Sequence, residues 1–431
     1  MTAEIAVLNK EAIALAADSA VTMSGPSGRK IFQSANKIFA LSKRYPVGIM
    51  VFGNANFMDV PWETIIKKYR SSLGEKGFDD CEDYAKDFFS YLTKASRLFP
   101  ASQQDKYFSN TLESYFTHLR TQIIKKVQSR QEQAGSIDEE QVRLLVSERI
   151  SALHEKLGKY TYLPKMDAKF EASLATKYRL KIEEIRGKVF EQLPLSETDS
   201  LKLKDIAVEI FCRMGQDVFH SGISGVVIAG FGHDDIFPRL YAYYAEGIVR
   251  KRVKYFKSGE QVISHDSASA IMPFAQDEMV CSFMEGVVPG YEKEIERYLN
   301  DICHEYPKAI LDSIVSLAEE ERNRIKENLG QLSEEWLKNY KKRLDTYRTE
   351  HFVDPVINVV SVLPKDELAT MAETLVNLTS FRKKVTIEEE TVGGPIDVAV
   401  ISRGDGFIWI KRKHYFKPDL NQNFFSNYRR H

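Results

Sequence analysis

The chain has 431 residues, of which 43% are hydrophobic and 28% are charged, and its 60 Lys and Arg residues nearly balance its 61 Asp and Glu residues. This balance, without a basic block, argues against nucleic acid as a partner, because phosphate contacts require excess cationic side chains on one face. The apolar runs are shorter than the roughly 18 residues that a membrane-spanning helix needs, and no basic segment precedes the apolar stretch near the N-terminus. We therefore expect a cytoplasmic protein with no membrane partner, and a length above about 200 residues indicates several domains or one core with large insertions.

The cysteines and histidines are scattered. None of the four cysteines is part of a C-x-x-C pair, which argues against a disulfide framework or a zinc site. The run His233-Asp234-Asp235 is better explained by turn chemistry than by metal binding. We expect neither a metal nor a cofactor.

Short strands are expected in the first 56 residues, separated by Gly-, Pro-, Ser- and Asn-containing breaks. Their predicted ranges are 3–8, 12–22, 31–41 and 47–53. From about residue 57 to residue 216 apolar residues recur every three or four positions, which predicts several amphipathic helices.

Strand patterns return in the middle of the chain and again near its end, with helical stretches between them. Strands are expected at 226–230, 239–245, 261–264, 268–274, 396–402 and 407–411, and helices at 277–285, 291–348 and 368–378. The Arg-Gly-Asp at 403–405 is read as the turn of the last hairpin rather than as an adhesion motif.

This order of elements predicts an α+β fold in which a layered core is interrupted by helical insertions. The expected core is discontinuous, and the other segments are two helical insertions and a C-terminal tail. The core comprises residues 2–56, 219–286 and 355–412, the insertions 57–216 and 287–354, and the tail 413–431.

Successive hairpins are expected to bring four positions together. A first turn near Asn9-Lys10 sets Thr2 opposite Ala17 or Asp18. Turns near residues 26–27 and 44 then bring Asp18 close to Lys37, and Lys37 beside the strand that ends at Gly53.

These residue types suit acyl transfer. A threonine at the N-terminus after removal of Met1 can use its own α-amine, whose pKa is about 8, as general base. Lys37 would favour the alkoxide-like state, Asp18 would hold Lys37, and backbone N–H groups near Gly53 would stabilise an oxyanion.

Three segments also resemble a known family. The runs Ala16-Ala17-Asp18-Ser19, Ala35-Asn36-Lys37-Ile38 and Gly48 to Ala55 are similar to those of N-terminal nucleophile hydrolases of the proteasome β-subunit and bacterial proteasome-like peptidase type. Later runs, Ile228 to Gly232 and Gly393 to Val398, resemble the central hairpin and final strands of that family.

The resemblance implies a four-layer αββα sandwich with inserted helical subdomains and a threonine peptidase with Thr2 as nucleophile, Lys37 as cation, Asp18 as its partner and Gly53 at the oxyanion site. It also implies a substrate-binding region that includes Val21, Thr22, Ala35, Phe39, Met50 and Phe52.

The expected substrate is a peptide or protein, and the expected assembly is a homo-oligomer, with a regulatory partner on the helical insertions as a further possibility. Two alternatives stay open: an amidase or acylase that acts on a small molecule, and a proteasome-like scaffold without catalytic activity.

Overall fold

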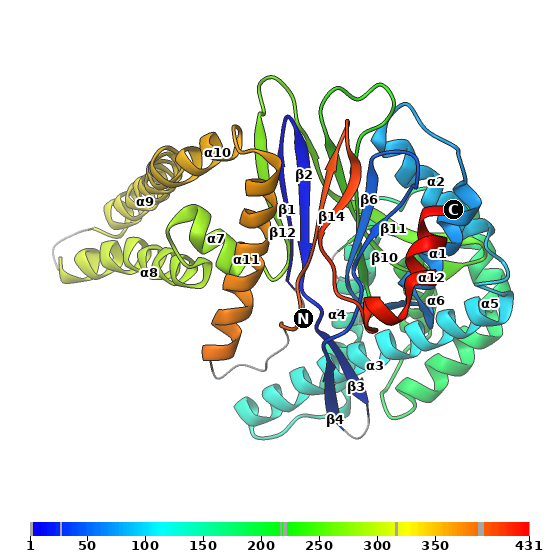
Figure 1. Ribbon diagram of the computed structural model, residues 1–431. Coiled ribbons are helices and arrows are strands. Elements are labelled where there is room, and N and C mark those ends of the chain that lie inside the picture. Colours follow the sequence, from blue (N-terminus) through cyan, green and yellow to red (C-terminus); the bar gives the residue numbers. More distant parts are fainter. Residues whose placement is uncertain are drawn as a thin grey trace. The chain divides into compact units, whose positions relative to one another are not determined.

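The structure is a computed structural model that describes residues 3–25, 28–215, 218, 222–314, 318–386 and 392–430. The protein is a mixed α+β chain with antiparallel sheets. It divides into two compact units, Met1–Ile38 with Val262–His431, and Phe39–Gln261. Each unit is described by itself, since their relative placement is not determined (Figure 1).

The first unit is built on a five-stranded sheet of order β12-β1-β2-β13-β14. The strands are β1 (Ala3–Asn9), β2 (Ala12–Ala17), β12 (Ser269–Ala275), β13 (Asp397–Ser402) and β14 (Gly406–Lys411). Helix α11 (Lys365–Val385) lies along one face of this sheet (Figure 1). The residues that face it on β1 and β2 include several alanines, which let the helix backbone approach closely.

One hairpin and several helices complete the first unit. A hairpin of β3 (Val21–Gly25) and β4 (Gly28–Phe32) follows β2. The helical elements are α7 (Glu278–Glu285), α8 (Pro289–Ser313), α9 (Glu319–Arg348), η2 (Thr349–Val353), α10 (Asp354–Val360), η3 (Pro418–Leu420) and α12 (Gln422–Arg430).

The second unit has its own five-stranded sheet, of order β11-β10-β9-β6-β5. The strands are β5 (Ile38–Ala40), β6 (Val47–Gly53), β9 (Ser224–Gly230), β10 (Arg239–Val249) and β11 (Arg252–Val262), with a small pair β7 (Asn56–Phe57) and β8 (Val60–Pro61). Helices α1 (Trp62–Leu73) and α2 (Cys81–Lys94) bury their aromatic faces against this sheet. One face of the sheet is therefore covered by the two helices that follow β8 in the chain.

The remaining helices of this unit have a hydrophobic core of their own. They are α3 (Ala101–Ala134), α4 (Glu139–Gly158), α5 (Ala168–Phe190) and α6 (Glu197–Cys212). Phe108 stacks between Tyr178 and Phe211 at ring-centroid distances of 3.8 and 4.5 Å. The stretch predicted to be helical thus holds α1–α6, and none of the helices in the described segments is long and apolar enough to cross a lipid bilayer.

The first hairpin differs from its predicted register. Glu4 pairs with Ala17, so the partners are offset by one or two positions from those expected. The cause is the turn: the Asn9 side chain accepts the N–H groups of Glu11 and Ala12 at 2.9 and 3.2 Å. This side-chain turn shifts the bend towards Lys10 and Glu11.

Two predicted strands are also interrupted. The run 12–22 is split at residues 18–20, between β2 and β3, and the run 31–41 is split at residues 33–37, between β4 and β5. The predicted strand at 261–264 agrees only at residues 261 and 262, because β11 extends from Arg252 to Val262. The first two interruptions contain Asp18 and Lys37.

The charge of Glu209 in α6 generates a stability prediction. The residue is buried, and burial, together with the nearby Glu171 carboxylate, raises its pKa to about 7. The folded state therefore binds the Glu209 proton more tightly than the unfolded chain does, and the bound proton stabilises the fold. This contribution to the free energy of unfolding is complete below the ordinary pKa of 4.5 and is lost as pH rises through 7.

We expect Glu209→Gln to raise the free energy of unfolding at pH 8 by at most about 3 kcal/mol, with little gain near pH 4.5. Denaturant titrations of the full chain at both pH values measure the difference. Glu183→Gln, which changes an exposed carboxylate paired with Lys204 at 3.1 Å, is the control and should give no gain. An equal effect of Glu209→Gln at the two pH values would contradict the assignment.

Candidate active site

The carboxylate of Asp18, just beyond the end of β2, is buried and fully hydrogen-bonded. Its Oδ1 accepts the Ala3 N–H at 3.1 Å and the Lys37 ammonium at 2.5 Å. Its Oδ2 accepts the N–H groups of Ala20 at 3.2 Å and Gly393 at 2.9 Å. The Asp18 side chain therefore joins four segments of the first unit at the position where the chain leaves β2.

Lys37 is held between two carboxylates. Its Nζ lies 2.5 Å from Asp18 and 3.1 Å from Glu4 Oε1, and its side chain is only 5% exposed. Glu4, the second residue of the apolar β1 strand, is fully buried. The structure thus brings together Asp18 and Lys37, as expected, and adds Glu4 as a second acidic partner.

A second buried ion pair lies beside the first. Asp397 is paired with Ala17 in the sheet, so it lies next to Asp18. Its Oδ1 accepts the backbone N–H of Lys413 at 2.8 Å, and its Oδ2 binds the Lys413 ammonium. Burial lowers the pKa of Lys413, and the positive charge of Lys37 lowers it further, against the opposite effects of Asp397 and Asp18. Lys413 therefore belongs to the same electrostatic cluster.

The turn before β13 holds the lysine-bearing segment in place. Gly393 donates to Asp18 and accepts the Ser19 N–H at 3.2 Å, and the Ser19 hydroxyl donates to the Pro395 carbonyl. The Ser19 carbonyl in turn accepts the Ala35 N–H at 3.1 Å. Residues 33–37 are thereby attached to the end of β2 and to the turn that contains Gly393.

The predicted nucleophile, Thr2, lies outside the described residues, but its neighbour is firmly placed. Ala3 donates to the Asp18 carboxylate, and its carbonyl accepts the Asp18 N–H at 3.1 Å. Of the predicted substrate-binding residues in this unit, Val21 and Ala35 are half-buried. Thr22 pairs with Ile31 in the β3–β4 hairpin, and its side chain is outside the described part.

The other predicted site residues belong to the second unit. Gly53 ends β6 with φ +78°, and a Cβ there would lie 2.8 Å from the Ile223 carbonyl oxygen, so only glycine fits. Phe39, Met50 and Phe52 are buried. The Phe52 ring occupies the space above Gly225 and contacts Tyr244 edge-on at 5.7 Å.

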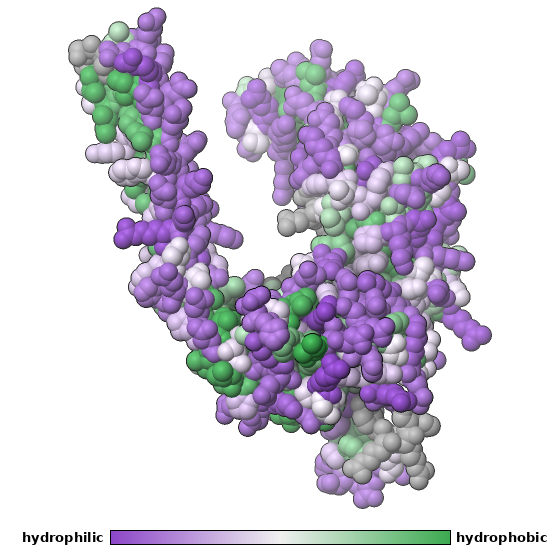
Figure 2. All heavy atoms as spheres, turned by 90° about the horizontal axis from the view of Figure 1, so that it is seen from above, coloured by the Kyte–Doolittle hydropathy of each residue, from purple (hydrophilic) through white to green (hydrophobic). Residues whose placement is uncertain are grey.

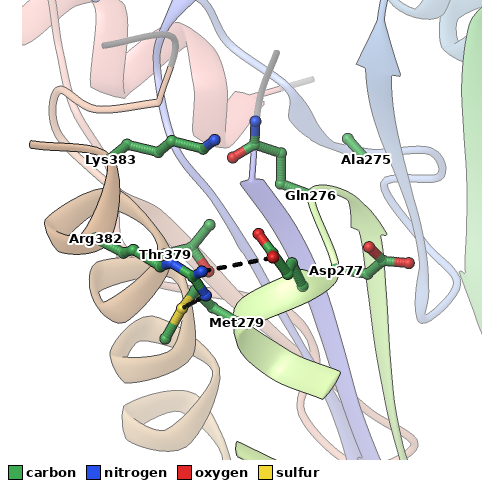
Figure 3. Close-up of a pocket in the computed structure, with 8 residues that line it drawn as sticks. Ala275, Gln276, Asp277, Met279, Thr379, Arg382 and Lys383 are labelled. Carbon is green, nitrogen blue, oxygen red and sulfur yellow. Dashed lines mark hydrogen bonds and ion pairs between the residues drawn. The ribbon is translucent and has the colours of Figure 1, made fainter. Parts of the chain in front are cut away.

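A cavity of about 160 Å³ opens at the end of β12 in the first unit (Figure 3). Ala275, which pairs with Ala3 in the sheet, forms one wall. Arg382 and Lys383 of α11 approach from the other side, and the Arg382 guanidinium contacts Met279 Sδ at 2.8 Å and Glu278 Oε1 at 3.5 Å. The register with Ala3 places this cavity next to the start of β1.

Sequence reasoning missed Glu4, Asp397 and Lys413. A usable signal existed for the first two, because each carboxylate occurs in an otherwise apolar strand and a charge buried in this way requires a partner. No comparable signal marks Lys413, which lies in a polar stretch after the last strand.

No protein-family model and no curated protein sequence matches this chain. The function must therefore be inferred from the site itself. It offers two lysines and three carboxylates, all largely buried, next to the first residues of β1. Such a cluster can bias the protonation of a neighbouring hydroxyl or amine, because charges in a poorly solvated site interact strongly.

The Asp18 carboxylate generates the first prediction for this site. Asp18→Asn removes the charge that faces Lys37 and directs an NH₂ group at two of the four donors. We expect a loss of about 3 kcal/mol in the free energy of unfolding. Asp405→Asn, at the exposed ion pair with Lys365, is the matched control and should leave the unfolding midpoint unchanged. Equal midpoints for wild type and Asp18→Asn would contradict this account.

Gly394 generates the second prediction for this site. It has φ +80°, and an added Cβ would lie 2.8 Å from Gln33 Cβ and 3.2 Å from the Gln33 carbonyl oxygen. We expect Gly394→Ala to displace residues 33–37 and to cost about 1–3 kcal/mol, measured by denaturant unfolding. Gly404→Ala is the control, since nothing lies within 4 Å of a Cβ at that position. A neutral Gly394→Ala would show that the turn tolerates a side chain.

Proposed function

We propose that the protein is an N-terminal threonine hydrolase that cleaves amide bonds through an ester on Thr2. The observation that carries this proposal is the attachment of Ala3 to the Asp18–Lys37 pair. The Ala3 nitrogen and the Lys37 ammonium share one carboxylate oxygen, at 3.1 and 2.5 Å. Thr2 is covalently bonded to that nitrogen, and in the proposed site its hydroxyl and amine lie beside the Lys37 charge.

In the proposed reaction, Met1 has been removed and the free α-amine of Thr2 takes the proton of the Thr2 hydroxyl. The oxygen attacks the substrate carbonyl carbon, the C–N bond breaks, and the leaving amine receives the proton. Water then attacks the resulting ester, which releases the carboxylic acid and restores the hydroxyl. Lys37 would favour the developing oxyanion of Thr2, and Asp18 and Glu4 would orient Lys37.

We further propose that the two units form the four-layer αββα sandwich of proteasome-like hydrolases. Two features support this: each unit has a five-stranded antiparallel sheet with helices on one face, and every residue of β1, β2 and β9 is buried. In that arrangement the backbone N–H near Gly53 would serve as oxyanion donor. Val21, Thr22, Ala35, Phe39, Met50 and Phe52 would contribute to substrate binding.

The size of the cavity at the end of β12 favours a second candidate substrate. About 160 Å³ accommodates a small acyl or amine group rather than several peptide residues. An amidase that acts on a small molecule is therefore the alternative to a peptidase, with the same nucleophile and the same chemistry.

The proposal is tested first by intact mass and then by activity. We expect a purified mass that lacks Met1, hydrolysis of some members of a fluorogenic panel of peptides and small amides, and loss of at least about 100-fold in rate for Thr2→Ala. Thr2→Ser is the control, since it keeps a hydroxyl, and should retain part of the activity. A retained Met1, or a Thr2→Ala rate equal to wild type, would exclude Thr2 as the nucleophile. An inactive wild type without Met1 would favour the scaffold alternative.

A further inference from the structure

Helices α8 and α9 form an antiparallel pair that extends from the rest of the first unit (Figure 1). Along this pair, hydrophobic residues gather on one side and hydrophilic residues on the other (Figure 2). Helix α8 begins just after α7, and helix α9 continues into η2, so these four elements meet at one end of the pair. There the protein has a cavity of about 260 Å³, which we call the helix-pair cavity.

The walls of the helix-pair cavity are apolar and partly aromatic. They are formed by Val287, Ile295, Tyr340, Leu344, Tyr347 and Phe352. The rings of Tyr347 and Phe352 are inclined to each other by 61°, with their centroids 6.3 Å apart. Gly286, at φ +70°, makes room for the Phe352 ring, because an added Cβ would lie 2.6 Å from that ring. The aromatic wall therefore depends on the glycine that ends α7.

Carboxylates form most of the polar lining. The Arg348 guanidinium lies 3.2 Å from Glu285 Oε2 and also binds Glu292. A third carboxylate, Glu296, lies 3.2 Å from the ammonium of Lys341, which does not line the cavity. Among the described residues that line the cavity, three carboxylates therefore stand against one guanidinium. An excess of one carboxylate remains when Lys341 is included.

The backbone that carries Phe352 is also unusual. Helix α9 continues into α10 through η2, which is a π-helical stretch of five residues, Thr349–Val353. Such stretches are rare within α-helices and occur frequently at functional sites. A π turn in the wall of the helix-pair cavity therefore supports a ligand site rather than a simple gap in the packing.

The helix-pair cavity is separate from the cavity at the end of β12. Within the described part of the chain, no residue lines both. The first turn of α7 borders the cavity at β12, whereas Glu285 and Gly286, at the other end of α7, border the helix-pair cavity. An α-helix of eight residues is about 12 Å long. Binding in the helix-pair cavity therefore does not depend on the proposed hydrolase activity.

We propose that the helix-pair cavity binds a small organic cation, in which an ammonium group is attached to an aromatic or branched apolar group. The apolar group packs against the aliphatic and aromatic walls. The ammonium group lies near the rings and the carboxylates, both of which attract positive charge. An anion would be repelled by the three carboxylates, and a neutral ligand would gain nothing from their charge.

The volume of the cavity sets the size of this ligand. An apolar cavity of about 150 Å³ is large enough to bind benzene. The 260 Å³ of the helix-pair cavity therefore accommodates a group of that size together with a short ammonium-bearing chain.

The probe is phenethylammonium, and the comparators are phenethyl alcohol and phenylacetate, which are of nearly the same size but carry no positive charge. Ligand-observed NMR titrations of the full chain measure each Kd. We expect phenethylammonium to bind with a Kd of about 1 mM or lower, which a ligand of this size can reach. Its affinity should exceed that of either comparator at least about 5-fold. Absence of binding at about 10 mM, or equal affinity for a comparator, would overturn the proposal.

A substitution that fills the cavity locates the binding site. Leu344→Trp should raise the Kd of phenethylammonium at least about 10-fold, because the larger side chain occupies the space of the ligand. Leu332→Trp is the matched control, since it makes the same change at an exposed position of α9 outside the cavity, and it should leave the Kd unchanged.

A change of charge without a change of shape guards against misfolding of Leu344→Trp. Glu296→Gln removes one lining carboxylate, so it should raise the Kd of phenethylammonium about 3-fold and leave that of phenethyl alcohol unchanged. Glu294→Gln, at an exposed ion pair with Arg297 outside the cavity, is the control and should change neither Kd. If Leu344→Trp and Glu296→Gln both bind phenethylammonium as wild type does, with unchanged helical content by circular dichroism, the probe binds elsewhere and the proposal is wrong.

Discussion

The first unit depends on the need to satisfy one buried carboxylate. Asp18 accepts three backbone N–H groups and one ammonium, from residues as far apart in the chain as Ala3 and Gly393. A buried charge without partners would cost several kcal/mol. The start of β1, the end of β2, the lysine-bearing segment and the turn before β13 must therefore meet at this point.

The surrounding cluster is a costly way to stabilise a fold. Glu4, Asp18, Lys37, Asp397 and Lys413 are all largely buried, although apolar residues of similar size would often be as stable. An exposed Asp18 could orient Lys37 only loosely, because water would screen the pair. Burial makes the lysine a fixed charge beside the start of β1, and such preorganisation is what the proposed acyl transfer would require.

The two long helical regions have different physical characters. Helices α3–α6 enclose a core of stacked aromatic residues and so are able to stabilise themselves. Helices α8 and α9 fully bury only Leu311 and Ser333 among their described residues, and several of their aromatic side chains are exposed. Helical periodicity is present in both, so the distinction depends on which apolar stripe finds a partner within the same chain.

The sequence by itself determined most of the secondary structure and the identity of the central pair. Alternation and turn residues located the strands of both sheets except most of β11, and hairpin reasoning brought Asp18 towards Lys37. Tertiary structure alone decided the register of the first hairpin and the interruptions at residues 18–20 and 33–37. The register was set by the Asn9 side chain, and at the interruptions the side chain of Asp18 and its partners took hydrogen bonds that a continuous strand would have used. It also decided which groups Glu4, Asp397 and Lys413 meet. An acidic residue in an apolar strand signals that a partner is needed, but packing alone determines which partner it is, as when β13 places Asp397 opposite Ala17.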